Sequence, residues 1–125
     1  MFIREKESVK AVEWGNGLSY RFIVVADRMG FSLAETLVYA GTKSRLQYRN
    51  HLEACYCISG QGQVVSADGA VQYEIRPGVL YALDQHDAHF LIADEREDLR
   101  LISVFNPALR GDEVHSLDGT GFSEY

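Results

Sequence analysis

The feature that most constrains the fold of this chain is the close spacing of its turn signals. Glycine and proline interrupt the sequence roughly every 8–12 residues, at residues 15–17, 60–62 and 77–78, and residues 67–69 (Ala-Asp-Gly) form a further hairpin signal. The runs between these breaks are short and rich in valine, isoleucine, tyrosine and phenylalanine, which favour β-strands. No long amphipathic helix fits between them. The pattern therefore predicts an all-β protein, either a sandwich or a small barrel.

The apolar runs give a specific set of predicted strands. We expect strands at residues 9–14, 18–26, 31–39, 45–49, 51–58, 63–66, 71–75, 79–83, 89–92 and 99–105. Residues 31–39 have a composition that also suits a helix, but their length and even spacing favour a strand. We expect a turn at residues 41–44, and the polar tail from residue 110 onward is expected to form a cover or to be partly mobile.

Length and composition suggest one ordinary globular domain, residues 1–125. The chain is 46% hydrophobic and 24% charged, and its net charge is −6. The acidic balance argues against a nucleic-acid partner and against an anionic membrane, because both require a basic face. No apolar run approaches the roughly 18 residues of a membrane span, and the first residues do not resemble a signal peptide.

The two cysteines, Cys55 and Cys57, stand two residues apart in a predicted strand. Both side chains would point to the same face about 7 Å apart, which is too far for an easy disulfide. We therefore expect two reduced, buried thiols in a cytoplasmic protein.

The stretch from residue 77 to residue 89 contains the first candidate site. Tyr81 lies on one predicted strand and His89 begins the next, on what we expect to be adjoining strands, while Glu53 lies on a strand predicted to face them. We expect these three side chains to meet inside a small β-barrel and to hold a metal ion. Three protein ligands with one open position are typical of a catalytic metal site, and a phenolate oxygen is a hard donor that suits iron.

The spacing of glycines and polar residues resembles the two motifs of the cupin superfamily. In the first motif, the two histidine places hold other side chains, while the glutamate and both glycines are kept: Gly41, Gln47, Arg49, Glu53 and Gly60. The second motif keeps its glycine and its last histidine: Gly78, Asp84, His86, His89 and Ala93. The resemblance implies a double-sheet jelly roll that forms a small barrel.

Three blocks narrow the resemblance to the ectoine synthase family of cupins: HLEACYCISGQG at 51–62, YALDQHDAH at 81–89 and VFNPALRGDEVH at 104–115. The resemblance implies a cyclising hydro-lyase that closes the ring of N-γ-acetyl-2,4-diaminobutyrate with loss of water. It implies Fe²⁺, or else Zn²⁺ or another divalent metal, with the ligands Glu53, Tyr81 and His89. The catalytic residues that it implies, beside Tyr81, are Glu113 and His115. The substrate-binding positions that it implies are Arg21, Thr36, Tyr48, His51, Ser103 and Phe105.

The chain departs from the family pattern at three places. A family tryptophan falls on Gly17, although Trp14 is close by; an asparagine falls on Ala34, and a cysteine falls on Ser103. These changes leave open an alternative function, namely a divergent cupin that acts on or binds another small amino-acid derivative as an isomerase, dioxygenase or sensor. In either case we expect a small-molecule substrate and, by analogy with cupins that pair through an edge strand, a homodimer.

Overall fold

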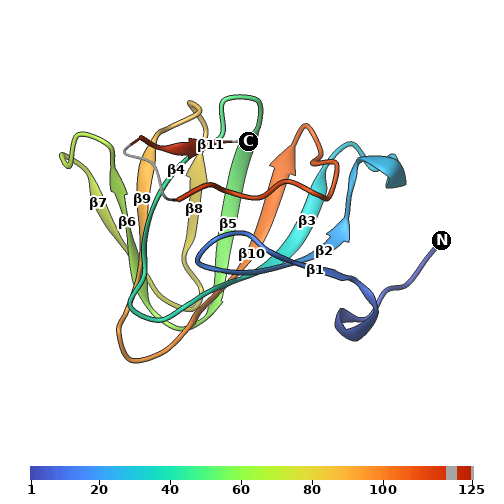
Figure 1. Ribbon diagram of the computed structural model, residues 1–125, viewed down its shortest axis with the longest axis horizontal. Coiled ribbons are helices and arrows are strands. Elements are labelled where there is room, and N and C mark those ends of the chain that lie inside the picture. The colour runs from blue at the N-terminus through green and yellow to red at the C-terminus, as the bar shows by residue number, and fades with distance from the viewer. Residues whose placement is uncertain (118–120, 125) are drawn as a thin grey trace.

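The computed structural model describes residues 1–117 and 121–124 as an almost purely β structure (Figure 1). Helix among these residues is limited to the short 3₁₀ segments η1 (Lys6–Ser8) and η2 (Val25–Asp27). No helix in this part of the chain is long and apolar enough to cross a membrane. The strands are β1 (Lys10–Glu13), β2 (Gly17–Ile23), β3 (Ser32–Val38), β4 (Lys43–Gln47), β5 (Leu52–Ser59), β6 (Gly62–Ser66), β7 (Gln72–Ile75), β8 (Leu80–Leu83), β9 (His89–Ala93), β10 (Leu99–Asn106) and β11 (Ser123–Glu124).

The strands form two sheets that enclose the core between them (Figure 1). The first sheet has the order β1-β2-β3-β10-β5-β8 and is antiparallel throughout. The second has the order β11-β4-β9-β6-β7, in which only the short β11–β4 pair is parallel. The predicted all-β class and double-sheet arrangement are therefore confirmed. Since inward positions alternate along each strand, the sequence alternation determines which side chains face the core.

Two of the predicted strands differ from the observed ones by more than one residue at an end. The strand predicted at residues 18–26 ends at Ile23, because the backbone N–H of Val24 donates to the Asp27 carboxylate (2.9 Å) and that of Val25 donates to the Leu109 carbonyl (2.8 Å). The apolar pair Val24–Val25 thus leaves the sheet for η2. The strand predicted at residues 45–49 begins at Lys43, which pairs with Ile92 of β9, so the predicted turn is shorter by two residues.

The relative placement of the three predicted metal ligands also differs from expectation. Tyr81 and His89 do not lie on adjoining strands, since β8 belongs to the first sheet and β9 to the second. Glu53 on β5 does not face Tyr81 from an opposite sheet either. Strands β5 and β8 are direct neighbours, with Cys55 paired to Tyr81 and Glu53 paired to Leu83. The prediction failed because the chain crosses from the first sheet to the second between β8 and β9 instead of continuing as a hairpin.

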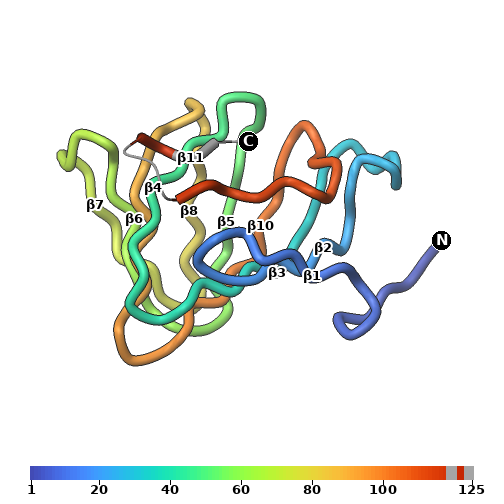
Figure 2. Tube along the Cα trace, viewed as in Figure 1, coloured from blue at the N-terminus to red at the C-terminus, as the bar shows by residue number. Residues whose placement is uncertain are grey.

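The described part of the C-terminal tail crosses the open side of the two sheets (Figure 2). It leaves β10, passes over the first sheet and reaches the second, where β11 pairs with β4. On the way the N–H of His115 donates to the Trp14 carbonyl (3.0 Å). The prediction of a cover is borne out by these contacts, and the tail adds side chains to the interior; residues 118–120 and 125 of the predicted tail lie outside the described residues.

Candidate active site

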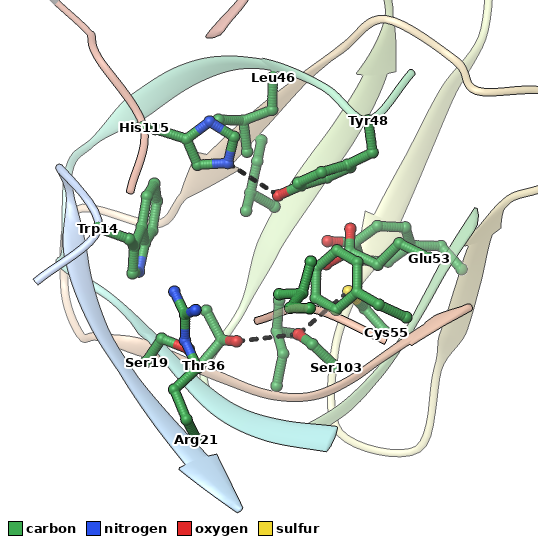
Figure 3. Close-up of a pocket in the computed structure, with 15 residues that line it drawn as sticks. Trp14, Ser19, Arg21, Thr36, Leu46, Tyr48, Glu53, Cys55, Ser103 and His115 are labelled. Atoms are coloured by element: carbon green, nitrogen blue, oxygen red, sulfur yellow. Dashed lines mark hydrogen bonds between the residues drawn. The ribbon is translucent and has the colours of Figure 1, made fainter. Parts of the chain in front are cut away.

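A narrow cavity lies between the two sheets, beneath the C-terminal tail (Figure 3). It has about 420 Å³ of space including its open mouth, of which about 30 Å³ admits the centre of a water molecule. A ligand that enters it must therefore give up most of its water. Both sheets and the tail contribute to the lining: Trp14, Ser19, Arg21, Thr36, Leu46, Tyr48, Glu53, Cys55, Tyr81, Leu91, Leu101, Ser103, Phe105, Leu109 and His115.

Arg21 supplies the positive charge of this cavity. The alternation of β2 places Ser19 and Arg21 on its inward face, and Arg21 is only 6% exposed. Its Nε donates to Ser19 Oγ (2.8 Å) and its Nη2 to the Glu113 carbonyl (2.7 Å). Its Nη1 lies 3.6 Å from the Glu113 carboxylate but has no hydrogen-bond partner. The guanidinium is thus fixed in place with one N–H group free to bind a ligand.

Glu113 stands behind Arg21 rather than in the cavity lining. Its carboxylate accepts hydrogen bonds from the backbone N–H groups of Arg110 and Gly111, both at 2.9 Å. Partial burial raises the pKa of this carboxyl, but these hydrogen bonds outweigh burial and hold it below its ordinary value. Glu113 is therefore a carboxylate that anchors both the tail and Arg21.

A row of small polar side chains crosses the floor of the first sheet. Thr36 Oγ1 and Ser103 Oγ are 2.9 Å apart, and Ser103 Oγ is 3.4 Å from Cys55 Sγ (Figure 3). The row follows from the strand register, because β10 lies between β3 and β5 and Ser103 pairs directly with Cys55.

On the opposite side of the cavity, Tyr48 and His115 form a hydrogen-bonded pair (Figure 3). Tyr48 Oη lies 3.1 Å from His115 Nε2, and both residues are buried. The Tyr48 ring also packs edge-on against Phe105, with a centroid separation of 5.0 Å. Such a pair can hold and move a proton inside the cavity.

Trp14 lines the cavity close to Gly17, the position at which the family pattern has a tryptophan. A Cβ at Gly17 would lie 1.7 Å from the Leu37 carbonyl oxygen and 3.1 Å from Trp14 Nε1, so no side chain fits there. Trp14 reaches the cavity instead, with its Nε1 donating to the Leu37 carbonyl (3.2 Å) and its ring edge-on to His115. A side chain is thus excluded at Gly17, and the indole of this cavity comes from Trp14.

Glu53 and Tyr81 form the acidic end of the lining. Burial raises the pKa of the Glu53 carboxyl to about 8, and burial together with the neighbouring Cys55 and Glu53 raises that of the Tyr81 phenol well above its ordinary value. A raised pKa means that each of these acidic groups is costly to ionise without a nearby cation.

His89 is buried in the second sheet, 2% exposed, with its ring centroid 6.2 Å from that of Tyr48. Its Nδ1 lies 2.9 Å from the Asp87 carbonyl, which accepts the Nδ1 hydrogen and leaves the lone pair on Nε2. That Nε2 is buried without a partner. Burial also lowers the pKa of His89, so its neutral form is favoured.

Comparison with known proteins identifies the family. The sequence profile described as ectoine synthase matches residues 1–124. The L-ectoine synthase of Desulfatibacillum aliphaticivorans is 50% identical to this chain over 86% of its length and 81% of the relative's. The chain belongs to the ectoine synthase family. It is therefore an enzyme of the hydro-lyase class.

Solved structures agree with this assignment. The crystal structure of ectoine synthase from P. lautus superposes with a TM-score of 0.83 at 40% identity, covering 89% of this chain and 81% of the other. A cupin domain of Schizosaccharomyces pombe Cnp3 superposes with a TM-score of 0.66 at 11% identity, over 81% of this chain and 70% of the other, which shows a shared fold alone. The predicted cupin fold is thus confirmed.

The residues that the family resemblance implied are not all in the cavity lining. Arg21, Thr36, Tyr48, Glu53, Tyr81, Ser103, Phe105 and His115 line it, whereas His51, His89 and Glu113 do not. His51 lies at the edge of the site, with its Nδ1 2.8 Å from the Pro107 carbonyl and its ring 6.2 Å from that of Phe105.

The cavity also contains residues that the set of predicted site positions lacked, chiefly Trp14, Ser19 and Cys55. Ser19 could have been found from the alternation that places it beside Arg21 on one strand face. Cys55 shares the inward face of Glu53 by the same period of two. Trp14 gave only the weak signal of an aromatic residue next to an expected tryptophan position.

The chemistry of the side chains of Glu53, Tyr81 and His89 suits the binding of a metal ion. A neutral imidazole with its other nitrogen bonded to a carbonyl, as in His89, is the form in which histidine binds metals. A buried carboxyl and phenol would both gain from a nearby cation. Among the described residues no three histidine, cysteine, aspartate or glutamate side chains converge on one metal position, and the proposed set differs from such clusters in its tyrosine.

Proposed function

We propose that this chain closes the ring of N-γ-acetyl-2,4-diaminobutyrate with loss of water, giving the cyclic amidine ectoine. Membership of the ectoine synthase family supports this proposal. The observation that carries it is the cavity itself, which has a fixed guanidinium, a proton-holding pair and an acidic end within one narrow space. These are the groups that an intramolecular condensation of an amino acid derivative requires.

Arg21 is assigned to the substrate carboxylate. Its free Nη1 can donate to a carboxylate oxygen, and a planar guanidinium suits that group better than an ammonium does. Thr36 and Ser103 offer hydroxyl groups to the polar part of the substrate, and the rings of Trp14 and Phe105 bound the space for the apolar part. Binding in a curled conformation brings the α-amine close to the acetyl carbonyl, which supplies the proximity effect.

The reaction forms one carbon–nitrogen bond and breaks the carbon–oxygen bond of the amide. Two protons of the α-amine must leave with the oxygen as water. We assign this transfer to Tyr48 and His115, whose Oη and Nε2 share a proton at 3.1 Å inside the cavity. Exclusion of bulk water by the narrow space favours the release of a water molecule. Glu113 holds Arg21 in place, and its direct part in proton transfer stays a prediction.

Glu53, Tyr81 and His89 would hold the metal, for which we propose Fe²⁺, with Zn²⁺ as the alternative. When bound, the ion supplies a Lewis acid that polarises the amide carbonyl. The unpartnered Nε2 of His89 and the raised pKa of Glu53 support this assignment. The residues themselves contribute an uncharged imidazole and two oxygen donors within a desolvated space.

The decisive experiment is turnover of N-γ-acetyl-2,4-diaminobutyrate by anaerobically purified, iron-loaded protein, with ectoine detected by NMR. Ectoine formed by the native protein and lost in Tyr81→Ala would support both the reaction and the site. Oxygen consumption without ectoine would favour a dioxygenase. If the protein binds one iron per chain but shows no turnover, the ectoine proposal is overturned while the proposed metal site is supported.

We also propose a homodimer in a reducing compartment. Strand β8 is an edge of the first sheet, and its Leu80, which is 59% exposed, pairs with the exposed Tyr56 of β5 to form an apolar outer surface. Such a surface fits a contact between two copies of the chain. The free, buried thiols of Cys55 and Cys57 fit the cytoplasm. Light scattering on the purified protein would decide the oligomeric state.

A further inference from the structure

Cys55 occupies a central position that the proposed reaction leaves unexplained. It is 1% exposed, it lines the cavity, and it lies on the middle strand of three. Its direct cross-strand partners are Ser103 on β10 and Tyr81 on β8. Glu53 precedes it by two residues on the same face of β5. The thiol is therefore surrounded by polar groups of the site.

The contacts of this thiol join two parts of the site that would otherwise be separate. On one side, Cys55 Sγ is 3.4 Å from Ser103 Oγ, which is itself 2.9 Å from Thr36 Oγ1. On the other side, Cys55 lies directly across from Tyr81 in the β5–β8 register and shares the inward face of β5 with Glu53, and all three side chains line the cavity. A hydrogen-bonded row thus runs from Thr36 through Ser103 to Cys55 (Figure 3), and Cys55 lies next to two of the proposed metal ligands.

We propose that Cys55 is a positioning residue, whose thiol orients Glu53 and Tyr81 for the metal and fixes the direction of the hydroxyl groups of Ser103 and Thr36. This inference rests on the metal site of the proposed function. As a metal ligand Glu53 is a carboxylate, which only accepts hydrogen bonds, so the single S–H of Cys55 would donate to it. The sulfur then accepts from the Ser103 hydroxyl, whose oxygen accepts from Thr36.

This ordering has a consequence for the substrate. Because the Thr36 O–H group is committed to Ser103, the oxygen of Thr36 presents its remaining lone pair to the cavity. Thr36 therefore accepts a hydrogen bond from a substrate N–H group rather than donating to an oxygen.

The chain provides a matched control in Cys57. This residue is also a buried thiol on the same face of β5, with 0% exposure, but it does not line the cavity. Within the described part of the chain, its Sγ donates to the backbone carbonyls of Ser59 (3.5 Å) and Gly60 (3.8 Å), and the side chain otherwise packs in the apolar core. Cys57→Ala removes a sulfur atom of the same size from the same strand without interrupting the row.

The test is an anaerobic titration of Fe²⁺ into metal-free protein, in which calorimetry measures the binding affinity. Loss of a group that supports metal ligands commonly lowers metal affinity about 10- to 100-fold, so we expect Cys55→Ala to bind Fe²⁺ at least about tenfold more weakly. We expect Cys57→Ala to bind as the native protein does, and Cys55→Ser to recover most of the loss because a hydroxyl also donates.

The outcomes separate this inference from the proposed function. Native protein that takes up no Fe²⁺ would overturn the metal site and this inference with it. Native protein that binds Fe²⁺, together with unchanged binding by Cys55→Ala, would overturn the role of Cys55 alone. An equal loss in Cys55→Ala and Cys57→Ala would point to packing of β5 and would also overturn it.

A second variant covers the case in which Cys55→Ala does not fold. Ser103→Ala keeps the thiol but removes the hydroxyl that is hydrogen-bonded to both Cys55 Sγ and Thr36 Oγ1. We expect weaker Fe²⁺ binding and a raised KM with a smaller change in kcat, since Thr36 loses its orientation. A Ser103→Ala protein with native Fe²⁺ affinity and native KM would refute the row as a functional unit.

Discussion

The hydrogen bond between Tyr48 and His115 allows a sharp test of the proposed proton transfer. Tyr48→Phe removes only the phenolic oxygen, which lies 3.1 Å from His115 Nε2. The ring remains, so its edge-on packing against Phe105 at 5.0 Å is kept. The variant thus separates the chemistry of the hydroxyl group from the packing of the aromatic ring.

The two expected effects of Tyr48→Phe differ in size. A hydrogen bond between uncharged partners contributes about 1 kcal/mol to the free energy of unfolding. A group that transfers protons contributes about 10²- to 10⁴-fold in rate, which corresponds to about 2.7–5.4 kcal/mol in the activation free energy at 1.36 kcal/mol per tenfold. We therefore expect kcat to fall at least about 100-fold while stability falls by about 1 kcal/mol.

Urea denaturation and steady-state kinetics on the iron-loaded protein would measure both effects of Tyr48→Phe. Tyr73→Phe is the matched control, because the Tyr73 side chain is 63% exposed on the edge strand β7 and does not line the cavity. It should leave both quantities unchanged. A kcat for Tyr48→Phe close to that of the native protein would refute the assignment of proton transfer to this pair.

Three further predictions concern the fold and the cavity. Gly17→Ala should destabilise the protein by at least about 1–3 kcal/mol in urea denaturation, because its Cβ would stand 1.7 Å from the Leu37 carbonyl oxygen; native stability would contradict this. Arg21→Gln should raise KM far more than it lowers kcat if the guanidinium binds the substrate carboxylate, and an unchanged KM would reject that role. Arg4 holds the pKa of the Asp27 carboxyl at about 2, so Asp27→Asn should be less stable than the native protein above about pH 4. This difference should disappear as the pH falls through 2, since protonation ends the Asp27 interaction; a difference independent of pH would exclude the ion pair as its source.

Most of the strands could be predicted from the sequence, because strand length, spacing and side-chain alternation are local properties of the chain. Residues 31–39 illustrate this point, since their composition suits a helix but their length and spacing indicated β3 correctly. The inward position of Ser19 and Arg21 followed from alternation alone. By contrast, Val24 and Val25 continue the apolar run of β2 and gave no local sign that Asp27 and Leu109 would draw them out of the sheet.

The candidate site was harder to predict because it depends on contacts between distant parts of the chain. The tail had the polar composition of a surface segment, yet His115 is buried, held by the Trp14 carbonyl and by Tyr48. No local pattern indicates a contact over such a separation. The resemblance to a known family identified His115, but it also included His51, which the structure places outside the cavity lining.

The atoms left without partners are the strongest structural argument for a ligand in this cavity. Among the described residues, three buried side-chain atoms have no hydrogen-bond partner: Arg21 Nη1, Glu35 Oε2 and His89 Nε2. Glu35 is compensated electrostatically, because Lys6 and Arg100 both lie near the same oxygen. Burial of an unpaired polar atom costs about 1–3 kcal/mol, and a stable fold retains such a cost most readily where a bound group removes it. Arg21 Nη1 lies near the Glu113 carboxylate (3.6 Å) but makes no hydrogen bond, and His89 Nε2 has no partner at all, so a substrate oxygen at the first and the proposed metal ion at the second would satisfy both atoms.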